Sequence, residues 1–358
     1  MKSPAIERAP LLILAITCLV AAVFAGLARF GLDVPHIFLS AAGFHSVLMI
    51  SGFFGTVIGL ERAVASRLAW PYFAPVLSGL SGALLLLDAP VLIPTVGFML
   101  AGLILASATG FAATKQPAIY TITLLAGAVL WPIGNLIWLG TGNFMASSYA
   151  GLGFLVLTVA GERLELTRFL PPKKFAAPMF VTIALLIIVS TIQASLKGIE
   201  TTSLGISYAL LALWMLAYDI ARKTVLKQGV TRFVAICLLS GYFWLLIGGV
   251  LLIFGNMTHI NLHDAGIHSV AIGFIFSMVI GHAPIIFPAV MRVKIPYSGI
   301  FYAPLAILNV GVLIRVIGGL DDNPTLQTLA GIINGMSIAT FLLVLVAQVI
   351  RHNRTYRG

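Results

Sequence analysis

The stretch Ile267-His268-Ser269-Val270-Ala-Ile-Gly-Phe-Ile-Phe-Ser-Met-Val-Ile-Gly281-His282 decides the fold class of this chain. It lies in a segment, residues 265–290, that contains no Asp, Glu, Lys or Arg. A helix of about 20 such residues spans the roughly 30 Å hydrocarbon core of a membrane. Inside that core a histidine is costly unless its ring is hydrogen-bonded, lines a cavity or ligates a metal. The stretch therefore predicts a transmembrane helix whose histidines need partners.

Similar apolar segments recur along the whole chain. Of its 358 residues, 60% are hydrophobic and 9% are charged, and the mean hydropathy is +1.07. These values exclude an ordinary soluble domain. We expect an all-α, polytopic membrane protein with short loops and a first segment too long to be a removable signal peptide. The twelve expected spans are 10–31, 37–61, 71–87, 90–112, 119–140, 145–165, 176–194, 204–221, 232–255, 265–290, 298–319 and 326–350.

The net charge of +10 is explained by the membrane rather than by nucleic acid. With twelve spans, all but three of the 21 Lys and Arg fall on one side of the membrane. The exceptions are Arg29, Lys197 and Arg315. By the positive-inside rule this bias predicts that both termini are cytoplasmic, as in a bacterial-type inner membrane protein.

A short internal similarity divides the chain into three. Lys115-Gln116 follows the fourth span and Lys227-Gln228 follows the eighth, and the second, sixth and tenth spans end alike. These features favour a single transmembrane domain of three pseudo-symmetric four-helix arcs, although matches this short also arise by chance. The matching ends are Gly59-Leu60-Glu61-Arg62, Gly161-Glu162-Arg163 and Gly281-His282, and the units are 1–116, 117–228 and 229–358.

Two histidines occupy near-identical settings in this pattern. Phe44-His45-Ser46-Val47 and Ile267-His268-Ser269-Val270 place His45 about eight residues into the second span and His268 about three residues into the tenth. Two histidines on separate helices at a similar depth suit axial ligation of a haem iron. The alternative is two unrelated polar residues, each hydrogen-bonded within a helix bundle.

Other polar residues near the expected outer surface extend this hypothesis. Arg29 and Arg315 end the first and eleventh spans there, and arginine commonly binds carboxylates such as haem propionates. Ion pairs with Asp33, Asp321 or Asp322 are the alternative. His259 and His263, four residues apart before the tenth span, suit a metal site, a rim around a propionate, or a plain polar loop.

A second group lies at the expected cytoplasmic ends. If the second, sixth and tenth spans line one axis, then Glu61, Glu162 and His282 converge there as a proton-active or metal-binding group. Salt bridges with the neighbouring arginines are the alternative.

On these residues the chain resembles the haem–copper oxidase subunit I fold, with a histidine early in spans two and ten. The stretch Ile267–His282 is more similar to the NnrS family, relatives of that fold linked to nitric oxide metabolism. The resemblance implies haem ligation by His45 and His268. Spans six and seven contain no histidine, however, where oxidases carry copper ligands, so any copper is expected elsewhere.

The function we expect is that of a membrane protein with one b-type haem, acting in respiratory electron transfer or nitric oxide metabolism. If it is an enzyme, it is an oxidoreductase. Because the loops are short, a quinol or a small gas such as nitric oxide is a more natural reactant than a docked protein. The alternative is a metal-free permease for a small substrate, whose intramembrane polar residues line a path.

Overall fold

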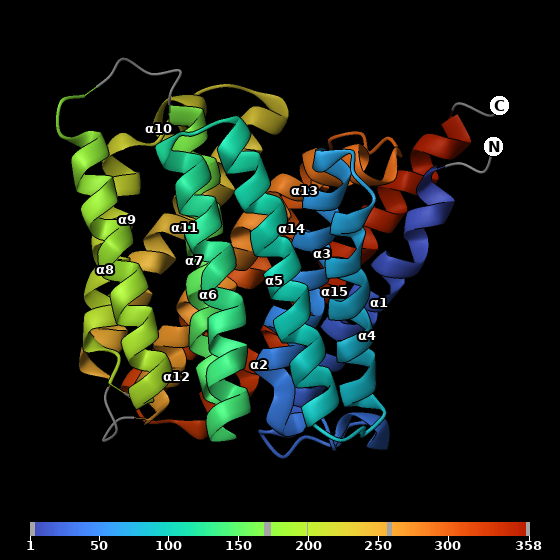
Figure 1. The fold of residues 1–358 in the computed structure, drawn as a ribbon, viewed down its shortest axis with the longest axis vertical. Coiled ribbons are helices and arrows are strands. Elements are labelled where there is room, and N and C mark those ends of the chain that lie inside the picture. The colour runs from blue at the N-terminus through green and yellow to red at the C-terminus, as the bar shows by residue number, and fades with distance from the viewer. Residues whose placement is uncertain (1–3, 168–172, 199, 256–259, 356–358) are drawn as a thin grey trace. The chain divides into compact units, whose positions relative to one another are not determined.

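The computed structural model describes residues 4–167, 173–198, 200–255 and 260–355, and within them every regular element is a helix (Figure 1). Ten of these helices are long and apolar enough to cross a membrane. They match ten of the twelve expected spans. The other two expected spans, 71–87 and 204–221, correspond to the shorter apolar helices Trp70–Leu86 and Thr202–Tyr218.

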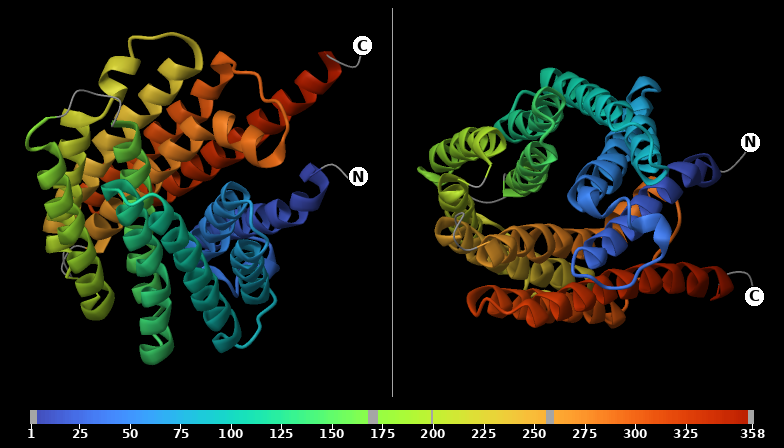
Figure 2. Two further views of the ribbon diagram at one scale, coloured as in Figure 1. Left: turned by 45° about the horizontal axis from the view of Figure 1, so that its top comes forward. Right: turned by 90° about the horizontal axis from the view of Figure 1, so that it is seen from below.

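The chain divides into two compact units, and the first comprises the residues up to Glu165 together with Ile188–Gly198. In this unit α5 packs between α4 and α6, as both views in Figure 2 show. Its large buried side chains include Phe98, Trp131 and Phe154, and the rings of the last two stack 5.6 Å apart. The helices are α1 (Pro4–Ala28), α2 (His45–Val47), η3 (Leu48–Phe54), α3 (Gly55–Ser66), α4 (Phe73–Leu86), α5 (Leu92–Lys115), α6 (Ile119–Thr141) and α7 (Phe144–Thr167).

The second unit comprises Leu166–Ile187 and the residues from Ile199 onward, so the division falls within α8 (Ala176–Lys197). In this unit α9 packs closely on α11. A Cβ atom on Gly205 would lie only 2.5 Å from the Gly249 carbonyl oxygen, so the two backbones approach this closely only where a side chain is missing. Small residues at such crossings let membrane helices approach each other. The remaining helices are α9 (Thr202–Tyr218), α10 (Ala221–Thr224), α11 (Gly229–Phe254), α12 (Ile260–His268), η5 (Ser269–Phe276), α13 (Ser277–Met291), α14 (Tyr302–Leu320) and α15 (Pro324–Thr355).

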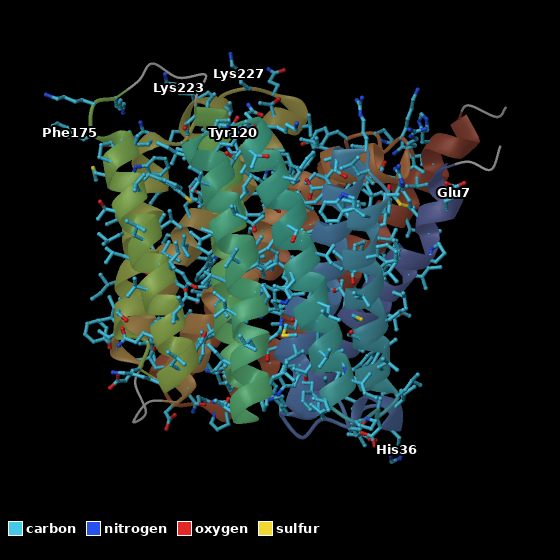
Figure 3. All side chains as sticks on the ribbon, viewed as in Figure 1. Glu7, His36, Tyr120, Phe175, Lys223 and Lys227 are labelled. Carbon is cyan, nitrogen blue, oxygen red and sulfur yellow. The ribbon has the colours of Figure 1, made fainter. Side chains whose placement is uncertain are left out.

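Both units have surfaces that suit lipid. Large apolar side chains are exposed along the helices, for example Ile122, Leu213 and Leu343. The helix ends are more polar. In the second unit Lys223 and Lys227 lie at one end of the helices, near the apolar Phe175 (Figure 3). In the first unit Glu7 and His36 lie at opposite ends of α1. Apolar flanks with charged ends are expected of helices in a bilayer.

Candidate functional site

His45 is held against the first helix of its unit. It begins α2, and its Nδ1 lies 2.5 Å from the carbonyl oxygen of Ala22 on α1. Gly26, one helical turn further along α1, faces the same ring: a Cβ atom there would lie 2.8 Å from Nδ1. Only the missing side chain of Gly26 therefore lets the imidazole approach α1 this closely.

This contact determines which nitrogen of His45 carries the lone pair. A carbonyl oxygen only accepts hydrogen bonds, so the neutral ring donates its proton from Nδ1 to Ala22. The lone pair is then on Nε2. A metal-ligating histidine commonly uses its other ring N–H in this way, which fixes the tautomer and the orientation of the ring.

His268 has a similar contact with an added charge. Its Nδ1 lies 2.8 Å from the carbonyl oxygen of Asp264, one turn earlier in α12, and 3.2 Å from the Asp264 carboxylate. The other carboxylate oxygen of Asp264 accepts a 2.6 Å hydrogen bond from Arg315 on α14. Gln327 on α15 in turn donates to the Arg315 carbonyl oxygen. His268 thus stands at the end of a polar chain that joins three helices.

The polar chain corrects two expectations. Arg315 is buried and forms an ion pair with Asp264. The sequence analysis gave Asp33, Asp321 and Asp322 as the alternative partners. Asp264 lies within α12, although the tenth span was expected to begin one residue later, at position 265. Arg29, the other arginine expected near a propionate, has an exposed side chain just after α1.

The depths of the two histidines along their helices are also reversed from the expected order. His45 lies three residues after the start of the continuous helical span Ala42–Ser66, and His268 lies seven residues after the start of Asn261–Met291. The tenth span begins before the expected position 265, because the polar residues that precede this position also belong to α12. Both histidines remain in the first third of their spans.

A backbone feature that the sequence analysis missed follows both histidines. The seven-residue π-helix η3 begins three residues after His45, and the eight-residue π-helix η5 begins directly after His268. π-helical turns are rare in proteins overall, but those that occur are frequently found at functional sites. Each packs against helices that precede and follow it in its unit, η3 against α1 and α4, and η5 against α11 and α14.

A sequence signal for this equivalence exists. His45-Ser46-Val47 is followed by Val57-Ile58-Gly59, and His268-Ser269-Val270 is followed by Val279-Ile280-Gly281. The two phrases differ by one residue in length. Periodicity alone does not reveal the π-helical turns, since both segments are apolar on most sides.

The three residues of the expected inner group are found in different settings. Glu162 on α7 accepts a 3.1 Å hydrogen bond from Arg62 on α3, so these two helix ends meet within the first unit. Glu61, beside Arg62, is half-buried. His282 is half-buried on α13 in the second unit, with Nδ1 2.8 Å from the Met278 carbonyl oxygen. Convergence of Glu61, Glu162 and His282 stays a prediction.

The two histidines of the outer metal hypothesis differ in what the structure describes, and the hypothesis stays a prediction. His263 is buried on α12, whereas His259 lies outside the described residues. Among the residues that the structure describes, no three His, Cys, Asp or Glu side chains group closely enough to hold a metal ion. A haem iron with two axial histidines needs no such group of three.

Several buried polar side chains of the first unit bond to one another or to nearby backbone carbonyl oxygens. Trp131 donates to the Ser51 hydroxyl, Ser78 donates to the Ser51 carbonyl oxygen, and Thr56 donates to Ser78. Beside His45, the hydroxyls of Ser46 and Ser148 lie 2.6 Å apart. These bonds satisfy polar groups that the apolar interior would otherwise penalise.

Comparison with known proteins places the chain in one family. A model described as a domain of unknown function, DUF8744, matches residues 8–350. The chain belongs to the DUF8744 family. No curated protein and no solved structure matches it. The family match spans nearly all of the helices, including both His-Ser-Val phrases.

Proposed function

We propose that this member of the DUF8744 family is a membrane haem protein in which His45 and His268 are the axial ligands of one b-type haem. One observation supports this above the others. Both histidines donate from Nδ1 to a backbone carbonyl oxygen, and both are followed by a π-helix. The contact alone is not distinctive, since His282 makes it too. We interpret His45 and His268 as ligand positions because each combines this hydrogen bond with a π-helix that follows it.

The donor set suits haem better than a small hard cation. Neutral imidazole nitrogens are common axial ligands of haem iron, whereas Mg²⁺ and Ca²⁺ prefer oxygen ligands. Both rings are half-buried on apolar helices, and this setting is compatible with a largely apolar macrocycle. Each histidine is tested separately by substitution.

A bound haem would supply one-electron chemistry. The chain's own residues would hold it: the Ala22 carbonyl oxygen orients His45, and Asp264 orients His268. Two axial histidines favour electron transfer over gas binding unless one of them dissociates. We place the protein in respiratory electron transfer or nitric oxide metabolism, with a quinol or nitric oxide as reactant. Its relation to the NnrS family and to haem–copper oxidases belongs to this proposal.

The membrane topology is part of the same proposal. We infer twelve spans, with Trp70–Leu86 and Thr202–Tyr218 crossing as short helices, and both termini in the cytoplasm of a bacterial cell. A fusion of a periplasm-active reporter to the C-terminus tests this: activity of that reporter would contradict the topology.

The haem is tested by the absorption spectrum of protein purified from haem-replete cells. We expect a Soret band, the pyridine haemochrome of haem b, and about one haem per chain. His45→Ala and His268→Ala each lose the haem or change its spin state. His36→Ala is the matched control, because His36 is exposed in a short helical turn of the first unit.

Folded, haem-free wild-type protein would overturn the proposal and favour the alternative, a metal-free permease. A permease would need intramembrane polar groups in the first unit that face a substrate path. The cluster of Ser51, Thr56, Ser78 and Trp131 is buried and bonded internally, as in a structural network.

A further inference from the structure

The two histidines differ in what their Nδ1 atoms contact. His45 faces the Ala22 carbonyl oxygen, which is neutral. His268 faces the Asp264 carbonyl oxygen at 2.8 Å and also the Asp264 carboxylate at 3.2 Å. A carboxylate beside the ring N–H makes the opposite nitrogen a stronger donor to a metal.

Asp264 is itself held in place from the far side. Arg315 donates to its second carboxylate oxygen at 2.6 Å, and the Arg315 side chain is only 3% exposed. The Arg315 guanidinium also lies 3.4 Å from the Gln327 side-chain oxygen. The buried Arg315 guanidinium favours the ionised form of the Asp264 carboxyl group within this apolar span. The carboxylate is thus fixed between His268 and Arg315.

We infer that Asp264 is a positioning residue for His268 that makes the two proposed haem ligands unequal and lowers the reduction potential of the haem. This inference rests on the proposed function. The physical reason is electrostatic: a negative charge hydrogen-bonded to a ligand stabilises ferric iron relative to ferrous iron. Hydrogen bonding to ligands is one of the means by which proteins adjust such potentials.

The test is an equilibrium redox titration of the purified, haem-containing Asp264→Asn variant. The amide retains an oxygen that accepts from Nδ1 but removes the charge, and the contact with the Asp264 backbone remains. We expect the ratio of ferrous to ferric haem at a fixed ambient potential to rise about tenfold, which corresponds to ~59 mV for one electron. A residue needed only for folding would change haem yield without this shift.

The matched control is Asp322→Asn. Asp322 lies in the same unit, is exposed, and accepts from Asn261 rather than from a histidine. Its backbone is left-handed, at φ 49°, a conformation that asparagine tolerates. This variant removes the same charge and should leave the potential unchanged.

The outcomes separate this inference from the function on which it rests. Wild-type protein without haem overturns both. Haem with two histidine ligands in the wild type, combined with an unchanged potential in Asp264→Asn, overturns only the role of Asp264. If Asp264→Asn yields no haem protein, Asp264→Glu is titrated instead: it keeps the charge and should remain within a few-fold of the wild-type ratio, and a tenfold rise there would contradict the inference.

Discussion

Adding one methyl group to α1 at Gly26 tests whether the contact between α1 and His45 positions a ligand. In Gly26→Ala the new Cβ would lie 2.8 Å from Nδ1 and 2.9 Å from Cε1 of His45. Ordinary contacts of this kind begin at 3.4 Å, so the imidazole has to retreat by about 0.6 Å. Both atoms belong to the rigid ring, and the whole ring therefore moves.

The size of this shift decides the expected result. Metal–ligand distances tolerate about 0.2 Å, and functional constellations tolerate about 0.5 Å. A shift of about 0.6 Å exceeds both, so we expect haem affinity to fall by about 10- to 100-fold, as for loss of a residue that orients a ligand.

The fold itself should survive the substitution. Replacing glycine by alanine within a helix gains about 0.5–1 kcal/mol, and overpacking costs about 1–3 kcal/mol. The free energy of unfolding therefore decreases by no more than about 2.5 kcal/mol.

The assay measures haem content and thermal unfolding of the purified variant in detergent. Gly110→Ala is the matched control, because Gly110 is also half-buried and its nearest atom, a Leu125 methyl, lies at an ordinary 3.6 Å. If Gly26→Ala keeps full haem and an unchanged spectrum while His45→Ala loses it, the positioning of His45 by α1 is refuted.

Two further predictions follow from the contacts described above, and a third follows from the sequence. Arg315→Gln leaves Asp264 without its cation and should cost between the ~1 kcal/mol of an exposed pair and the ~3–5 kcal/mol of a buried one, measured by thermal unfolding; an unchanged melting temperature would contradict this. Arg62→Gln breaks a half-exposed pair with Glu162 and should cost under about 1 kcal/mol, with haem content unaltered. Because the sixth and seventh expected spans contain no histidine, we expect no copper at the usual oxidase position. Any copper found by elemental analysis should be lost when five residues are substituted together, namely His259, His263, Glu61, Glu162 and His282. One copper per chain that survives this combined substitution would refute the placement.

Much of the helical framework is predictable because apolar length is a strong signal in sequence. Ten expected spans coincide with long apolar helices, and their bounds differ by a few residues. The other two expected segments, 71–87 and 204–221, correspond to the shorter apolar helices Trp70–Leu86 and Thr202–Tyr218. Their lengths agree to within one residue, so apolar composition predicts the length of these helices as well as their position.

The site was less predictable because its polar residues obtain their partners from distant parts of the chain. Asp264 resembles a loop residue in sequence, but Arg315, 51 positions later, pairs with it and stabilises the first turn of the span. Ala22 is a backbone partner of His45, and a side-chain pattern gives no sign of a carbonyl contact. Gly26 was likewise indistinguishable from other helix-packing glycines.

The recurrence of the π-helix adds a physical reason to treat His45 and His268 as equivalent positions. His45 lies 14 residues before Gly59, and His268 lies 13 residues before Gly281. In α7 the corresponding Gly161 follows Ser148 by 13 residues, and there the helix is α-helical throughout. Of the three matching segments, the two with a histidine contain a π-helix, and the one with a serine does not. π-helical turns are rare in proteins but occur frequently at functional sites. Their coincidence with histidine is expected where the backbone is shaped around a ligand.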